Sequence, residues 1–340
     1  MDLIISNDLK PIIVITGEAC SIIIDSVDRP TDNRRKHMAP RQKRLLLAVD
    51  GSERALLTVQ YAGEEDAFKE MKIVLFHVFN SIPEAYYDLE REPKSVKVVR
   101  HVRNWEAEQK KIIRKHMDDA MKMLLDAGHA ESAVDVRIQN RKKGVARDII
   151  IEAQKGYDAV LIRRRGATTL KNITMGSVTN KLLEKLTFIP VLIAGRKPVN
   201  KKVLVAVDGS PCATRAVRFV ADMLGPLDDY QLRLVYVVRG GGAPDVAALE
   251  ADGITDTGPI FEALINMLTA AGFDPQNIST KTITGVMSRA GAIVNAAEKG
   301  DWGTIVMGRR GLSRVRDFFM GHVSNKVVHV GHMHTVWVVT

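Results

Sequence analysis

Three glycines near the end of the chain have a spacing that could make room for a phosphate-bearing ligand. Gly308 and Gly311 are separated by two residues, and Gly321 follows after nine more. A glycine has no Cβ, so the backbone can approach a bulky ligand closely. The third glycine precedes a predicted helix, whose first N–H groups and positive dipole end favour an anion. This pattern indicates a binding loop, although ordinary turns and helix caps use glycines in the same way.

An Asp-Gly-Ser motif follows a short apolar run twice, beginning at Asp50 and at Asp208. In an open parallel sheet, ligands bind beyond the carboxyl ends of the strands, where the winding direction reverses. A carboxylate there can accept hydrogen bonds from ribose hydroxyls. Ser52 and Ser210 can instead cap the helix that follows. We therefore treat both aspartates as candidate binding residues and both serines as candidate caps.

The elements around these motifs are repeated along the chain. Residues 43–52 reappear 158 residues later as 201–210, and residues 166–181 reappear 145 residues later as 311–326. The first copy is therefore 13 residues longer inside. We expect the extra length between 80 and 116, where a charged stretch precedes an amphipathic helix.

A length of 340 residues suits two domains. The division that we expect is an extension or linker without fixed structure at 1–40, a first repeat at 41–197 and a second repeat at 200–340. The first segment could also form an extra hairpin or an anchoring arm. A chain started at Met38 would begin just before the first strand. The apolar runs of 1–40 are short and broken by charges, which is not typical of a signal peptide.

Short β-branched runs alternate with helical patterns in both repeats, which is typical of right-handed βαβ crossovers around a buried parallel sheet. The fold class we predict is α/β, with two tandem Rossmann-like domains, each a five-stranded parallel sheet flanked by helices. The expected strands lie near 44–49, 72–79, 133–138, 158–162, 190–194, 202–207, 231–238, 278–284, 303–307 and 335–339.

The composition favours a globular protein without a membrane partner. Hydrophobic residues make up 46% and charged residues 26%, and no apolar run is long enough to cross a bilayer. The cysteines, Cys20 and Cys212, have neither disulfide nor zinc spacing, which favours the reducing cytoplasm. The net charge of +9 suits phosphate-bearing ligands, or solubility alone. Nucleic acid is disfavoured because no aromatic stacking motif accompanies the basic residues.

The strand-Asp-Gly-Ser start and the Gly-x2-Gly-x9-Gly-Ser/Thr ending resemble the universal stress protein family over nearly all of 41–340. The resemblance implies a fold of the adenine nucleotide alpha hydrolase type and, in the ATP-binding branch, phosphates at the glycine motif. It leaves ATP, ADP and AMP open as ligands, with or without Mg²⁺. The positions that it implies for nucleotide binding in the second repeat are Asp208, Val237, Met307, Gly308, Gly311, Gly321, His322, Val323 and Ser324. Those in the first repeat are Asp50, Val78, Gly166, Gly176, Ser177 and Val178.

Two residues depart from the family pattern. His322 stands where the motif has a small hydroxyl residue, and Arg163 occupies the first glycine position of the first repeat. The Cβ of Arg163 should crowd a ligand, although its guanidinium could instead reach a phosphate. Neighbouring arginines in these loops, Arg164, Arg165, Arg309, Arg310, Arg314 and Arg316, could form a phosphate clamp or simply be solvated.

No motif nominates a catalytic residue. The sequence has no P-loop, no Gly-x-Ser-x-Gly elbow and no His-Glu-x-x-His, and His329, His332 and His334 lack a recognisable metal-ligand spacing. At most, a positioned water could hydrolyse ATP slowly. The expected function is an ATP-binding stress-response protein acting through nucleotide-dependent conformation or partner binding. The alternatives are a nucleotide-independent scaffold and a slow ATPase.

Pairing of the two repeats within one chain is a further expectation. We expect them to meet face to face, with the last strands at 190–195 and 335–340 as paired edges, because pairing satisfies exposed backbone groups. Further association into a homodimer and unidentified protein partners stay open.

Overall fold

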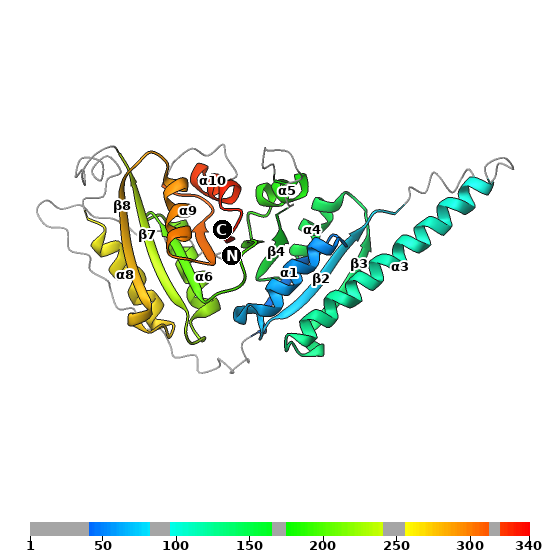
Figure 1. Ribbon diagram of the computed structural model, residues 1–340, viewed down its shortest axis with the longest axis horizontal. Coiled ribbons are helices and arrows are strands. Elements are labelled where there is room, and N and C mark those ends of the chain that lie inside the picture. The colour runs from blue at the N-terminus through cyan, green and yellow to red at the C-terminus, as the bar shows by residue number, and fades with distance from the viewer. Residues whose placement is uncertain (1–40, 82–95, 165–174, 241–255, 313–319) are drawn as a thin grey trace, which may run out of the picture. The chain divides into compact units, whose positions relative to one another are not determined.

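A computed structural model describes residues 41–81, 96–164, 175–240, 256–312 and 320–340 (Figure 1). Residues 42–340 belong to one compact unit. The segment 1–40 and the predicted binding residue Gly166 lie outside the described residues, as do Arg165, Arg314 and Arg316.

The strands of the described residues form one ten-stranded sheet in the order β3-β2-β1-β4-β5-β10-β9-β6-β7-β8. The first repeat contributes β1 (Arg44–Ala48), β2 (Lys72–Phe79), β3 (Val134–Asn140), β4 (Ala159–Arg163) and β5 (Val191–Ala194). The second contributes β6 (Lys202–Val207), β7 (Gln231–Arg239), β8 (Ile278–Val286), β9 (Thr304–Gly308) and β10 (Thr335–Val339). Within each repeat all paired strands are parallel. The predicted fold class is confirmed.

Helices cover both faces of the sheet. One face carries α1 (Glu53–Glu64), α3 (Val96–Asp126), α6 (Pro211–Leu224) and α8 (Gly258–Ala270). The other carries α4 (Val145–Ala153), α5 (Ser177–Lys185), α9 (Arg289–Lys299) and α10 (His322–Val330). Short 3₁₀ turns lie at η1 (Asp66–Phe68), η3 (Glu131–Ala133) and η4 (Pro275–Asn277). Alternate strand residues enter the two apolar cores, as with Leu45 and Leu47 on one face and Leu46 on the other.

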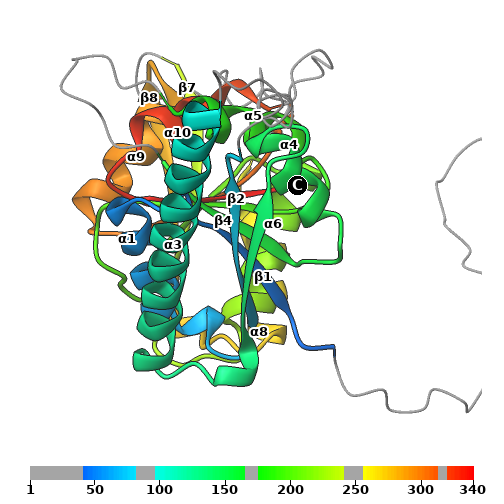
Figure 2. The same ribbon diagram turned by 90° about the vertical axis from the view of Figure 1, so that its right-hand side faces the viewer.

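The predicted helix caps are present. The hydroxyl oxygens of Ser52 and Ser210 accept hydrogen bonds from the N–H groups of Ala55 and Ala213, at 3.3 and 3.2 Å. The extra length of the first repeat lies between β2 and β3, as expected. Its helix there, α3, has 31 residues, whereas the counterpart α8 has 13. Figure 2 shows α3 standing in front of the strands of the first repeat.

The two repeats meet at the edges of their sheets. Strands β5 and β10 pair antiparallel, with Leu192 opposite Trp337. The expected pairing of the last strands is therefore confirmed, whereas the expected face-to-face arrangement is wrong. The physical reason is that each half ends in a strand with unpaired N–H and C=O groups, and joining those edges satisfies them in one continuous sheet.

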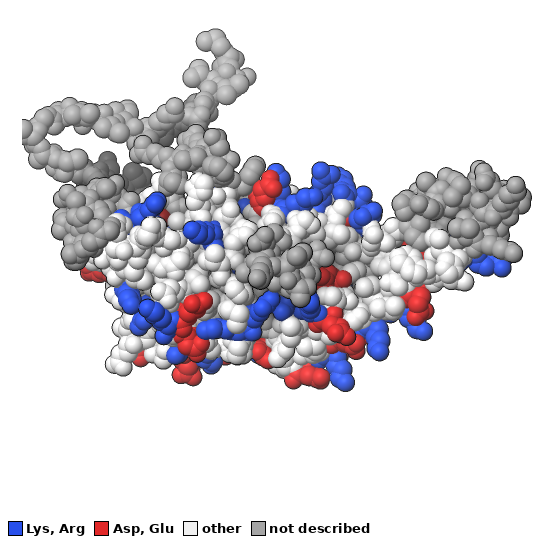
Figure 3. All heavy atoms as spheres, turned by 45° about the horizontal axis from the view of Figure 1, so that its top comes forward, with Lys and Arg blue, Asp and Glu red and all other residues white. Residues whose placement is uncertain are grey.

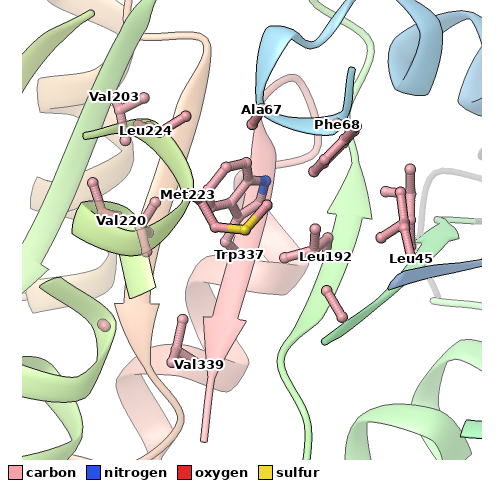
Figure 4. Packing of buried hydrophobic residues seen from close by; sticks show 14 of the residues in the cluster. Leu45, Ala67, Phe68, Leu192, Val203, Val220, Met223, Leu224, Trp337 and Val339 are labelled. Atoms are coloured by element: carbon pink, nitrogen blue, oxygen red, sulfur yellow. The ribbon is translucent and has the colours of Figure 1, made fainter. Parts of the chain in front are cut away.

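We call the pairing of β5 with β10 the join between the repeats. An aromatic cluster packs against the join on the sheet face that carries α1 and α6 (Figure 4). Trp337 is only 1% exposed. Its ring stacks on Phe68 with centroids 6.3 Å apart and meets Phe219 edge-on at 5.8 Å. Its indole N–H donates a hydrogen bond of 3.3 Å to the hydroxyl oxygen of Tyr61. Side chains of both repeats therefore share one core.

A buried carboxyl group lies beside this cluster. Glu65 accepts hydrogen bonds from the hydroxyls of Tyr61 in the first repeat, at 3.2 Å, and of Tyr230 in the second, at 2.5 Å. Burial raises the pKa of Glu65 above its ordinary value, and the bonds from Tyr230 and Tyr61 oppose the shift only in part. Folding therefore favours the protonated form of this group.

We expect this carboxyl group to make stability depend on pH. A raised pKa in the folded state gives stability that is fully present below the unfolded pKa of about 4.3 and is lost as pH rises through the raised value. The Glu65→Gln variant cannot titrate there. Its melting temperature relative to the wild type should therefore increase as pH is raised from about 4 to 8, in thermal melts.

The exposed neighbour Glu64 provides the control. The Glu64→Gln variant should track the wild type across the same pH range, because this side chain is exposed to solvent in the folded protein as it is in the unfolded chain. A constant difference between Glu65→Gln and the wild type at every pH would contradict the prediction.

Candidate functional site

A cavity of about 740 Å³ lies at the carboxyl ends of β6, β7 and β9. We call it the second-repeat cavity. Strand β6 lies between β7 and β9, which is where the winding direction reverses, so this is the crevice where an open α/β sheet binds ligands. The predicted second-repeat residues all line it: Asp208, Val237, Met307, Gly308, Gly311, Gly321, His322, Val323 and Ser324.

The three motif glycines differ in how closely other atoms approach them. A Cβ on Gly308 would lie 2.7 Å from the carbonyl carbon of Cys212, so this glycine allows α6 to begin against β9. A Cβ on Gly311 would collide with the carboxylate of Asp208. A Cβ on Gly321 would meet its nearest neighbours, in Arg309 and Arg310, at 3.4 Å. Only the third glycine could therefore be replaced without displacing the surrounding atoms.

Asp208 ties the glycine loop to the first strand of its repeat. One carboxylate oxygen accepts the N–H of Ser210 at 3.1 Å, and the other accepts the N–H of Leu312 at 3.3 Å. In the first repeat, Asp50 accepts the N–H and the hydroxyl of Ser52 at 3.0 and 2.6 Å. Both aspartates thus order the turn after their strand, and Asp208 also orders the loop that lines the cavity.

The hydroxyl of Ser324 already has a partner inside the protein. It donates a 2.8 Å hydrogen bond to the carbonyl of Gly308, and the residue is buried. Thr179 makes the same contact to the carbonyl of Arg163 at 3.2 Å in the first repeat. This hydroxyl therefore fastens the last helix to the preceding strand, and it cannot donate the same proton to a ligand.

The start of α10 provides backbone donors at the cavity. Gly321 is the N-cap, and the first bond within the helix runs from the N–H of Asn325 to the carbonyl of Gly321, at 2.9 Å. The N–H groups of His322, Val323 and Ser324 come before that bond, at the positive end of the helix dipole. An anion in the cavity would lie against this end.

Four basic side chains line the cavity besides the glycines: Arg239, Arg289, Arg310 and Lys326. The described lining holds one carboxylate, that of Asp208. Of these four, Arg310 alone is among the candidate arginines predicted from the sequence. The rule that ligands bind at the carboxyl ends of strands could have indicated Arg239, which ends β7, and Arg289, which follows β8. Arg289 also donates to the carbonyl of Val237 at 3.2 Å, which fixes it above that strand end.

The predicted residues of the first repeat occupy the corresponding ends of strands and helices. Asp50 follows β1, Val78 is buried near the end of β2, and Gly176 caps α5, which begins with Ser177 and Val178. Arg163 ends β4, just as Gly308 ends β9. Because Arg163 carries a Cβ, α1 cannot begin as close to β4 as α6 does to β9.

Two of the loop arginines are neither a phosphate clamp nor solvated, so both of those interpretations are wrong for them. Arg309 is 3% exposed, and its guanidinium donates to the carbonyls of Leu183, Glu184 and Leu186 at the end of α5. Arg164 is 8% exposed and donates to the carbonyl of Val328 near the end of α10. Each arginine reaches the last helix of the opposite repeat, where a cation complements the negative end of the helix dipole.

The three late histidines have separate partners. The Nδ1 atoms of His329, His332 and His334 lie 2.7, 3.1 and 2.7 Å from the carbonyl oxygens of Asn325, Val330 and Trp302, respectively. Among the described residues, no group of three or more His, Cys, Asp or Glu side chains is placed to hold a metal ion.

Comparison with known proteins shows to which family the chain belongs. The sequence profile of the Universal stress protein family matches residues 42–195 and again 200–339. The chain belongs to the universal stress protein family. Two matched segments make it a tandem member, as the resemblance of the motifs implied.

Three similar proteins are distant from this chain in sequence. A universal stress protein of Mycolicibacterium smegmatis is 25% identical over 182 residues, which cover 52% of this chain and 58% of that relative. A universal stress protein structure from Archaeoglobus fulgidus has a TM-score of 0.61 at 21% identity, covering 88% of this chain and 99% of that one. A protein of unknown function from Pseudomonas aeruginosa has a TM-score of 0.54 at 15% identity, covering 88% and 92%. These structural likenesses show the shared fold. None of the helices in the described part of the chain is long and apolar enough to cross a membrane.

Proposed function

We propose that the second repeat binds an adenine nucleotide in the second-repeat cavity, with the phosphates against the glycine loop and the start of α10. The observation that carries the proposal is the convergence of the three motif glycines and Asp208 on one cavity of about 740 Å³. Protein cavities that bind small-molecule ligands have volumes of about 300 to 1,000 Å³. The volume therefore suits a nucleotide.

The charges of the lining support a polyphosphate. Arg239, Arg289, Arg310 and Lys326 outnumber the single described carboxylate, so a ligand with several negative charges is favoured over a neutral nucleoside. We therefore place ATP ahead of ADP and AMP. The base would lie toward Val237, on the apolar side formed by Met307 and Ile293, and the ribose would lie near Asp208.

The described lining supports binding more strongly than catalysis. Its one carboxylate already accepts two backbone hydrogen bonds, and the hydroxyl of Ser324 donates to Gly308. Neither group is placed as a general base. We propose that nucleotide binding acts through a change in conformation or in partner binding during a cytoplasmic stress response, with ATP hydrolysis slow if it occurs.

The test uses equivalent glycines of the two repeats. Gly321 and Gly176 both cap the last helix of their repeat with extended backbone that any residue can adopt. We expect Gly321→Val to weaken ATP binding at least about tenfold, or ~1.4 kcal/mol, because its side chain enters the cavity. Gly176→Val should leave the affinity of the second repeat unchanged. Titration calorimetry with ATP and with AMP measures both variants.

Two outcomes would contradict the proposal. Equal ATP affinity for Gly321→Val and the wild type would exclude the cavity as the site. No heat and no thermal stabilisation of the wild type by any adenine nucleotide would favour the scaffold alternative. Mass spectrometry of small molecules released from the denatured protein would identify a ligand that co-purifies.

A further inference from the structure

The start of α9 places a guanidinium at the end of β7. Arg289 is the first residue of α9, and its Nε donates to the carbonyl of Val237 at 3.2 Å. Both residues line the second-repeat cavity, and Arg289 is partly buried. A guanidinium is planar and rigid, so a hydrogen bond from Nε restricts the orientation of the whole group. The protein therefore orients this side chain before any ligand binds.

A β-bulge near the end of β8 accounts for this approach. Val237 lies opposite Ile283 and Arg239 lies opposite Val286, so β8 has one residue more than β7 in this interval. Gly285 lies in the interval with a φ of 71°, which glycine adopts without strain. A bulge bends its strand and redirects the residues that follow. Since α9 begins shortly after β8 ends, the bulge brings the start of α9 to the cavity.

The cavity differs in chemistry between its β7 end and its β9 end. At the β7 end, the neighbours of Arg289 in the lining include the buried apolar side chains of Val237 and Ile293. At the β9 end, Arg310 comes from the glycine loop and Lys326 from α10. Strand β6 separates β7 from β9, so the two ends lie roughly 10 Å apart at the usual strand spacing. Figure 3, in which the top of Figure 1 comes forward, shows Lys and Arg side chains at separate places over the second repeat rather than in one patch. The cations of the cavity can therefore have different tasks.

The surroundings of Arg289 suit a nucleobase better than a phosphate. The side chains of Val237 and Ile293 offer no donor to an anion, and burying a charge without hydrogen bonds is costly. A guanidinium stacks on aromatic faces and is attracted to them by the cation–π interaction. Every base has such a face, so this contact does not depend on the phosphates. The base position proposed above, next to Val237, is adjacent to this guanidinium.

We propose that the guanidinium of Arg289 stacks on the base of the bound nucleotide, while Arg310 and Lys326 contact its phosphates. The base then lies between a planar cation and the apolar side chains of Val237 and Ile293. This inference rests on the function proposed above, because it requires a nucleotide in the second-repeat cavity. It assigns to Arg289 a large part of the affinity that the base contributes.

The test compares ATP with tripolyphosphate, which has a chain of phosphates but no base. Both are titrated by calorimetry into the full chain at about 0.15 M salt, where exposed charges more than about 8 Å apart are largely screened. We expect Arg289→Met to weaken ATP binding at least about fivefold and to leave tripolyphosphate binding unchanged. Arg289→Lys should not restore the affinity for ATP, because an ammonium keeps the charge and loses the planar group. Arg310→Met should weaken the binding of both ligands.

The control is Arg147→Met, which removes an exposed arginine from the first turn of α4, the corresponding helix of the first repeat. It should change neither affinity. If Arg289→Met does not fold, Arg289→Lys is measured in its place, with the same expected loss of ATP affinity at unchanged tripolyphosphate affinity.

Three results would overturn the inference. Arg289→Met could weaken tripolyphosphate binding as much as ATP binding, Arg289→Lys could keep the full ATP affinity, or both variants could bind ATP as the wild type does. Failure of the proposed function gives a different result, because ATP then does not bind the wild type at all, which overturns both.

Discussion

The Arg309→Met variant is expected to unfold with a free energy lower by about 2–4 kcal/mol, because three carbonyls, in two buried and one partly buried hydrogen bond, lose a charged donor. The guanidinium of Arg309 donates to Leu183, Glu184 and Leu186, the last carbonyls of α5. Methionine fills similar space without any N–H group. Urea unfolding followed by circular dichroism measures the change.

The neighbouring arginine is a matched control. Arg310 is exposed, so Arg310→Met should change stability by less than about 0.5 kcal/mol. If the two variants are equally stable, the bonds of Arg309 to α5 contribute nothing to folding. A loss near 2 kcal/mol for Arg164→Met, the counterpart in the first repeat, would support the reciprocal arrangement.

Arg309 also connects the glycine loop to the join between the repeats. It stands between Gly308 and Gly311, and its own carbonyl accepts the N–H of Gly321 at 2.9 Å. Its side chain meanwhile holds the end of α5 in the first repeat. The backbone position of the loop therefore depends on the opposite repeat. Arg309→Met should for this reason weaken ATP binding as well as stability, whereas a purely local loop would keep its affinity.

The partner of Arg309 is a feature that could not be predicted from the sequence. Strand positions, caps and the carboxyl-end location of the motif residues follow from local periodicity and from the topology rule, and the structure places them as expected. An arginine inside a glycine loop has the same local pattern whether it reaches a phosphate or a helix of the opposite repeat. The pairing of β5 with β10 fixes the position of α5. That position decides whether the arginine reaches a phosphate or the opposite helix.

The cavity lining illustrates a related limit. Asp208 and Gly321 could be found because the two repeats carry copies of their motifs, and Gly308 because of its spacing to Gly311 and Gly321. Arg239 and Arg289 have no such motif, and they approach Val237 only because β8 lies beside β7 in the sheet. Glu65 gave no signal either, since its partner Tyr230 lies 165 residues away in the chain. When a residue acts through contacts between distant segments of the chain, its role can be assigned only once the three-dimensional structure is known.

The Trp337→Ala variant is expected to lose about 3–5 kcal/mol of stability, the usual cost of removing a large buried aromatic side chain. The effect should be concentrated at the join. The ladder between β5 and β10 spans the pairs from Val191 and Val338 to Ile193 and Val336, so the backbone contributes only a short run of hydrogen bonds there. The contacts of Trp337 with Phe68 and Tyr61 of the first repeat must therefore supply much of the cohesion between the repeats, while Phe219 packs against the ring within the second repeat.

Differential scanning calorimetry distinguishes loss at the join from general destabilisation. With the join weakened, the two repeats should melt in separate transitions, because each keeps its own five-stranded sheet and flanking helices. The control is Trp105→Ala on α3, where the tryptophan is 50% exposed and its removal should cost little. If Trp337→Ala melted in the same single transition as Trp105→Ala, at the same temperature, the ladder between β5 and β10 and the arginines that cross it would be sufficient to hold the repeats together.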